Sequence, residues 1–121
     1  PLSQITGELT ATMSITRGYG LSTPSVSASI DAASHPQLSW NSIGGATVYY
    51  IFRRRYDSGC TAVTSDYEYM GLTGGTVFGD EDITATSVAT FPDCPYVQYY
   101  IYAASSQDVS QNSTLVFFDT Q

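Results

Sequence analysis

The chain of 121 residues has no lysine, a single histidine and few charged residues of any kind, at 12%. Eleven acidic residues against four arginines give a formal net charge of −7. Because no basic patch is available to neutralise phosphates, we expect no nucleic-acid partner. The lack of lysine excludes Schiff-base chemistry and the phosphate-binding loop. Since His35 is the only histidine, one chain cannot build a metal site from several histidines.

Long apolar runs and helical periodicity are also missing from the sequence. No segment approaches 18 consecutive apolar residues, which predicts that no part of the chain spans a membrane. No window of 11 residues repeats apolar residues at the spacing of a helix. Hydrophobic residues nevertheless make up 42% of the chain, which is enough to bury a core, and the length predicts one domain.

Cysteine is scarce, because Cys60 and Cys94 are the only two in the chain. They lack the C-x-x-C spacing and have no histidine cluster beside them, which disfavours metal binding. Two alternatives remain, a disulfide formed in an oxidising compartment and a pair of buried thiols in a cytosolic domain. The missing lysine and the abundance of serine and threonine favour the disulfide. We therefore expect an extracellular or cell-surface protein.

Short β-prone runs, separated by Gly, Pro, Asp and Ser, fill most of the sequence. They alternate apolar and polar residues and are rich in β-branched and aromatic side chains. The expected strands cover residues 25–30, 37–41, 46–54, 67–72, 76–78, 85–91, 96–104 and 115–118. Short strands at this regular spacing are typical of an all-β sandwich or a small barrel.

Six short motifs follow one another through residues 24–119. They are Pro24-x-Val26, Leu38-Ser39-Trp40, Ala46-x-x-Tyr49-Tyr50-Ile51-Phe52-Arg53, Tyr69-x-x-Leu72, Phe78-Gly79-Asp80 and Tyr99-Tyr100-Ile101-Tyr102-Ala103. In this order and spacing they resemble a fibronectin type III domain. The resemblance implies an all-β, Greek-key β-sandwich of the fibronectin type III, immunoglobulin-like type, with Trp40 in the core between the sheets. It also implies that Cys60 and Cys94 lie at the same end of the sandwich, close enough for a disulfide.

Two features depart from this family pattern. Val97 stands where the family usually places a tyrosine at the start of the sixth strand, with Tyr96 beside it. The connection from Ile83 to Cys94 is longer than usual. The run at 85–91 within it is therefore a candidate for an additional strand.

Few residue clusters are candidates for chemistry. His35 lies in a turn before Pro36 and no nucleophile elbow accompanies it, so we predict no catalytic residues and no enzyme. The acidic turn Asp80-Glu81-Asp82 is either a calcium site built from oxygen ligands or a solvated turn, and the second is favoured. We expect no metal and no other cofactor. Arg53-Arg54-Arg55 is expected to be a solvated strand end, with an acidic neighbour as the alternative.

A segment with strict period-2 alternation precedes the fibronectin-like region. Its odd positions are apolar or small, and its even positions are Thr, Ser or Glu. The odd positions are Ile5, Gly7, Leu9, Ala11, Met13 and Ile15. This pattern predicts a long β-strand with one apolar face, followed by a hinge at Gly18 and Gly20. We divide the chain into an N-terminal extension, residues 1–23, and a β-sandwich domain, residues 24–121.

The apolar face of this extension needs a partner, because an exposed apolar strand invites aggregation. The extension can form an eighth strand of its own sheet, or it can add to the sheet of a neighbouring copy. The second arrangement resembles the donor strands of secreted filament subunits. It predicts a structural subunit of an extracellular filament or pilus-like fibre, a homopolymer whose subunit interface contains the six odd positions.

The alternative function is a fibronectin type III spacer or binding module of a larger secreted enzyme or adhesin. Flexible, featureless ends are expected of such a module. This chain instead has an alternating strand near its start and a β-prone run that ends close to Gln121. We therefore expect a complete small polypeptide, processed or trimmed before Pro1.

Asn112-Ser113-Thr114 matches the acceptor sequence for N-glycosylation and lies in the polar stretch 105–113. Serine and threonine make up about a quarter of the chain, so we expect its surface to be hydrated through hydroxyl groups or attached sugars. We expect covalent glycans at Asn112. Tyrosines such as Tyr19, Tyr56 and Tyr67 have rings that can stack on sugars, although most tyrosines of the chain are expected to be ordinary sandwich residues.

Overall fold

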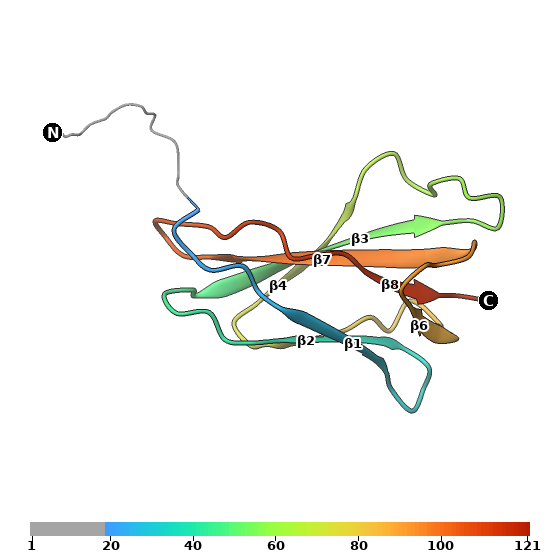
Figure 1. The fold of residues 1–121 in the computed structure, drawn as a ribbon, viewed down its shortest axis with the longest axis horizontal. Helices are drawn as coiled ribbons and strands as arrows, with labels where there is room; N and C mark the ends of the chain where they lie inside the picture. Colours follow the sequence, from blue (N-terminus) through green and yellow to red (C-terminus); the bar gives the residue numbers. More distant parts are fainter. Residues whose placement is uncertain (1–18) are drawn as a thin grey trace, which may run out of the picture.

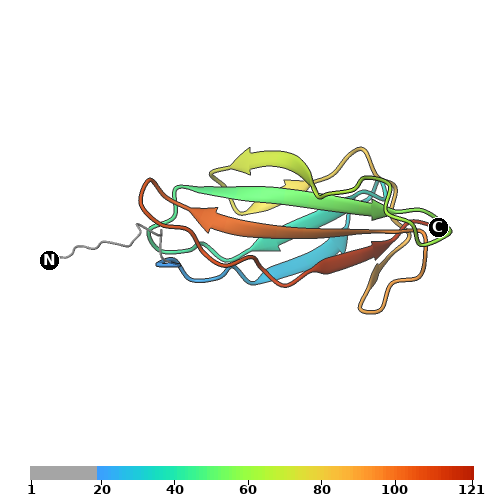
Figure 2. The same ribbon diagram turned by 90° about the horizontal axis from the view of Figure 1, so that it is seen from above.

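A computed structural model describes residues 19–121, which form two β-sheets packed face to face (Figures 1 and 2). The strands are β1 (Val26–Ile30), β2 (Pro36–Trp40), β3 (Val48–Tyr56), β4 (Glu68–Thr73), β5 (Val77–Gly79), β6 (Ser87–Ala89), β7 (Tyr96–Ala104) and β8 (Val116–Asp119). Each lies within two residues of its predicted position. Within residues 19–121, no helix is long and apolar enough to cross a membrane.

The two sheets are antiparallel throughout. One has three strands in the order β1-β2-β5, and the other has five in the order β4-β3-β7-β8-β6. Neighbours in a sheet such as β2 and β5, or β3 and β7, are far apart in sequence, so the chain crosses repeatedly from one sheet to the other. The predicted all-β sandwich is confirmed.

The hydrophobic core lies between the sheets, where strand alternation directs every second side chain inward. The longest pairing runs over nine residues of β3 and β7, from Val48 opposite Ala104 to Tyr56 opposite Tyr96. The buried hydrophobic cluster consists of Leu38, Trp40, Ile43, Tyr49, Ile51, Ala85, Val97, Tyr99, Ile101, Ala103 and Phe118. Trp40 is therefore a core residue, as predicted.

The long connection between Ile83 and Cys94 contributes a strand of its own. This strand, β6, pairs with β8 and places Val88 opposite Phe118. It covers part of the outer edge of β8, which would otherwise present unpaired backbone groups. The predicted additional strand is present, although only three residues of the run 85–91 belong to it.

The predicted donor strand, with Ile5, Gly7, Leu9, Ala11, Met13 and Ile15, lies outside the described residues, as does Gly18. The described chain begins at the end of the sandwich opposite Gln121 (Figure 2). A Cβ atom on Gly20 would lie 2.6 Å from Cγ of Asp108, and the N–H of Leu21 donates to the carbonyl of Val109 at 3.3 Å. Residues 20 and 21 are thus packed against the connection that follows β7.

Cys60 and Cys94 are joined by a disulfide, as predicted, with a Cα–Cα distance of 5.3 Å. It links the β3–β4 connection to the β6–β7 connection. Both connections lie at the end of the sandwich that carries the C-terminus (Figure 1). The disulfide therefore joins these two connections covalently at this end of the sandwich.

We expect replacement of both cysteines by serine to lower the free energy of unfolding by about 4 kcal/mol, because the bond closes a loop that restricts the unfolded chain. Urea unfolding of the oxidised wild type and of the double variant measures the difference. Wild-type protein treated with a reductant is the control and should match the variant. Equal urea midpoints for the oxidised and reduced wild type would contradict the expected stabilisation.

Candidate functional site

An ionic cluster is buried between the two sheets. The inward-facing Arg53 of β3 places Nη1 2.7 Å from Oδ2 of Asp80 and Nε 3.0 Å from Oε1 of Glu68. The hydroxyl of Tyr99, on β7, donates a second hydrogen bond to Asp80 at 2.5 Å. Arg53 is 5% exposed and Asp80 is 2% exposed. The charge of Arg53 is therefore neutralised inside the domain.

This cluster corrects two expectations about charged residues. The expectation of a solvated arginine triplet is wrong for Arg53, and that of a solvated acidic turn is wrong for Asp80, because each side chain supplies the counter-charge that lets the other be buried. Burial alone would lower the pKa of Arg53, but its hydrogen bonds to Glu68 and Asp80 outweigh burial and raise that pKa. Within residues 19–121, no three His, Cys, Asp or Glu side chains are grouped as metal ligands.

The outer face of the five-stranded sheet carries an array of aromatic rings. It consists of Tyr50, Phe52 and Tyr56 on β3, Tyr96, Tyr100 and Tyr102 on β7, and Tyr67, Tyr69 and Phe117 at the flanks. Cross-strand partners stack, with ring centroids 5.0 Å apart for Tyr50 and Tyr102 and 4.6 Å apart for Tyr56 and Tyr96. Such pairs stabilise a sheet and hold its register.

Arg54 is the one arginine of the triplet that points to this outer face. Its guanidinium carbon lies 5.6 Å from the ring centroid of Tyr56 and 5.8 Å from that of Tyr67. Its Nη2 donates to the carbonyl of Ser65 at 2.9 Å. The cation is thus held by ring faces and a carbonyl.

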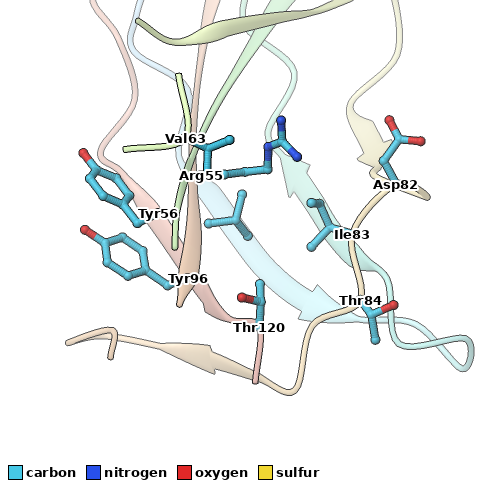
Figure 3. A pocket seen from close by; sticks show the side chains of 9 residues that line it. Arg55, Tyr56, Val63, Asp82, Ile83, Thr84, Tyr96 and Thr120 are labelled. Carbon is cyan, nitrogen blue, oxygen red and sulfur yellow. The ribbon is translucent and has the colours of Figure 1, made fainter. Parts of the chain in front are cut away.

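Figure 3 shows a notch of about 190 Å³ at the end of the sandwich that carries the disulfide. Its nine lining residues are Arg55, Tyr56, Val63, Asp82, Ile83, Thr84, Tyr96, Val97 and Thr120. None of the nine is a histidine, cysteine or serine, so the notch has no nucleophile paired with a histidine base. His35 lies elsewhere, in the β1–β2 turn, with Nδ1 3.5 Å from Oδ2 of Asp31.

Asn112, the predicted glycosylation residue, is exposed in the connection between β7 and β8. Two buried serines anchor this connection to β7. The Ile101 N–H donates to Oγ of Ser113 at 3.0 Å, and the Ala103 N–H donates to Oγ of Ser110 at 2.8 Å. Asn112 is therefore displayed between two anchored positions. The sequence marks these serines only as part of a polar stretch, because their role depends on β7 lying alongside.

Comparison with known proteins defines the fold. No family model matches the chain, and no curated protein matches it. An Fn3-like protein from Clostridium thermocellum matches with 20% identity and a TM-score of 0.54, over 78% of this chain and 86% of that one. The structure described as FN3tt mut matches with 16% identity and a TM-score of 0.51, over 80% of this chain and 90% of that one.

The similarity at these identities lies in the fold. Together with the two antiparallel sheets, it confirms the predicted fibronectin type III sandwich. A shared fold does not by itself indicate a function.

Proposed function

We propose that the chain is a structural subunit of an extracellular filament or pilus-like fibre. In this proposal residues 5–15 of one copy add as a β-strand to the sheet of the next copy. The observation that carries the proposal is the strict alternation from Ile5 to Ile15, in which every odd position is apolar or small. A slip of one residue would bury the hydroxyl face instead, so such a segment specifies its own register strongly.

The architecture of the domain supports strand donation in two ways. Residues 26–119 already supply eight strands, and β6 takes the place of an added strand beside β8. The sheets still end in open edges, formed by β1 and β5 in one sheet and by β4 and β6 in the other. An edge strand offers unpaired backbone groups to an incoming strand.

The position of the chain start supports a linear assembly. Residue 19 lies at the end of the sandwich opposite the C-terminus, and 18 residues precede it (Figure 1). A fully extended segment of this length spans at most about 65 Å, enough to run along a neighbouring copy beyond that end. Because donor and acceptor surfaces differ, repeated donation yields an open chain of subunits. The disulfide is compatible with an extracellular location.

Deletion of residues 1–17 is expected to leave a folded, soluble monomer that no longer assembles, because the donated strand is gone while the sandwich keeps its own core. Electron microscopy and sedimentation of the full chain and of the deletion variant measure assembly, and circular dichroism checks the fold.

Two double substitutions serve as matched tests of the faces. Leu9→Asp with Met13→Asp places two charges on the apolar face and should abolish assembly, whereas Thr10→Asp with Thr12→Asp places them on the hydroxyl face and should preserve it. A full chain that stays monomeric at high concentration, or a deletion variant that unfolds, would instead support a strand within its own sheet and the spacer or binding-module alternative.

A further inference from the structure

A shallow depression of about 200 Å³ lies beside Asn112. It is lined by Tyr19, Tyr102, Val109, Ser110 and Asn112 itself. Tyr19 is 67% exposed, and it directly precedes the packed residues at 20 and 21. The depression therefore combines tyrosine rings, one apolar side chain and polar groups at its rim. This combination suits a sugar, whose C–H face packs on an aromatic ring while its hydroxyls form hydrogen bonds.

The acceptor sequence beside this depression is presented at the surface. Asn112 and Thr114 are exposed, and Ser113 between them is buried. The Ser113 N–H donates to the Ile101 carbonyl at 2.8 Å, which fixes the backbone of the acceptor sequence to β7. Both residues that the acceptor sequence requires, the asparagine and the hydroxyl residue two positions later, are thus accessible together.

The other asparagine of the chain provides a contrast. Asn41 is followed by Ser42 and Ile43, so it lacks the required hydroxyl residue. Its Oδ1 also accepts a hydrogen bond from the Ser25 N–H at 2.8 Å. Asn41 has a structural role in the chain, and Asn112 alone has the features of a glycan acceptor.

We propose that Asn112 carries an N-linked glycan whose first sugar packs against the ring of Tyr19 in this depression. The sugar donor is a lipid-linked oligosaccharide. The bond between the anomeric carbon and the lipid phosphate breaks, and the phosphate leaves with the bonding electron pair. A bond from that carbon to Nδ2 of Asn112 forms, and the proton that Nδ2 loses passes through solvent to the released phosphate. Disulfides form in the same oxidising compartments in which such donors act, so Cys60–Cys94 fits this modification.

This proposal does not depend on filament assembly. A glycan here would cover the exposed Tyr19 side chain with hydroxyl groups. A charge-poor surface, with 12% charged residues in the chain, gains solubility from such a cover.

Mass spectrometry of the protein from its source cells tests the attachment. A chymotryptic peptide containing Asn112 should carry the added glycan mass, and the peptide containing Asn41 should not. In the same cells, Asn112→Gln and Thr114→Ala should lose the added mass, whereas Thr114→Ser should retain it, because serine keeps the hydroxyl group. An intact mass equal to that of the bare polypeptide would overturn the proposal.

Nuclear magnetic resonance of the glycosylated protein tests the packing. Protons of the first sugar should shift upfield through the ring current of Tyr19. The shift should disappear in Tyr19→Ala and persist in Tyr19→Phe, while the glycan mass stays the same in both. Unshifted sugar protons in the wild type, or a shift that survives Tyr19→Ala, would overturn the proposed packing of the first sugar against Tyr19.

Discussion

Replacement of Arg53 by methionine is expected to lower the free energy of unfolding by about 3–5 kcal/mol. The substitution removes the guanidinium whose Nη1 lies 2.7 Å from Oδ2 of Asp80, in a site where both side chains are almost fully buried. Asp80 would keep only the hydroxyl of Tyr99 as a side-chain donor and would remain a buried carboxylate without a counter-charge. Urea unfolding followed by the fluorescence of Trp40 measures the loss.

Arg54→Met is the matched control, because it makes the same change one residue later, on the opposite face of β3. Arg54 is partly buried and lies over the rings of Tyr56 and Tyr67, and contacts of this kind contribute roughly 0.5–2 kcal/mol, more where they are desolvated. We therefore expect a much smaller loss for Arg54→Met. Similar losses for the two variants would show that the loss in free energy of unfolding does not come from burial of the Arg53–Asp80 pair.

The same cluster predicts how stability depends on pH. Partial burial raises the pKa of Glu68, but the hydrogen bonds and charges of Arg53 and Arg55 outweigh burial, and the pKa of Glu68 is lowered. A carboxyl group whose folded pKa is lowered stabilises the fold above its unfolded pKa, at about 4.3 for glutamate. That contribution is lost as the pH falls from there through the folded pKa.

The wild type should therefore lose stability in this acid range more steeply than Glu68→Gln does. Urea unfolding of both proteins at a series of acid pH values measures the two slopes. Equal slopes would mean that Glu68 does not contribute to the acid sensitivity of the domain.

Trp40→Ala is expected to lower the free energy of unfolding by about 3–5 kcal/mol, through lost burial and the cavity that remains. Trp40 is 7% exposed, and its ring centroid lies 5.5 Å from that of Tyr49. The hydroxyl of Tyr49 accepts a hydrogen bond from the Ile43 N–H at 2.9 Å and so holds the connection between β2 and β3 in place. The Trp40 indole packs against this same tyrosine. Circular dichroism in urea measures the loss, since the variant has no tryptophan.

Trp40→Phe separates ring packing from the indole N–H. The buried Nε1 of Trp40 has no hydrogen-bond partner among residues 19–121. Phenylalanine removes this unpaired donor and keeps an aromatic ring, so we expect a clearly smaller loss than for alanine. Wild-type fluorescence with the spectrum of a water-exposed indole, or equal losses for the two variants, would contradict the core position of the ring.

The strands were predictable because their signal is local. The run from Tyr96 to Ala104 alternates buried and partly exposed side chains over much of its length, and its bounds match the prediction. Trp40 and the disulfide were predictable because family-like spacing places them relative to whole strands. The ionic cluster was not, because Arg53 meets Glu68 and Asp80 across 15 and 27 residues of sequence. A triplet of arginines contains no signal for which member is buried.

The order of the strands along the chain, the side chains that share a face of each strand, and the two-faced pattern from Ile5 to Ile15 can all be predicted from the sequence, because they follow from the period of consecutive residues. Three contacts become visible only in the folded domain: β6 covers the edge of β8, Tyr50 stacks on Tyr102, and Ser113 anchors the acceptor sequence to β7. Those contacts depend on the register between segments that are distant in the chain. Register is set when the sheets assemble around their common core.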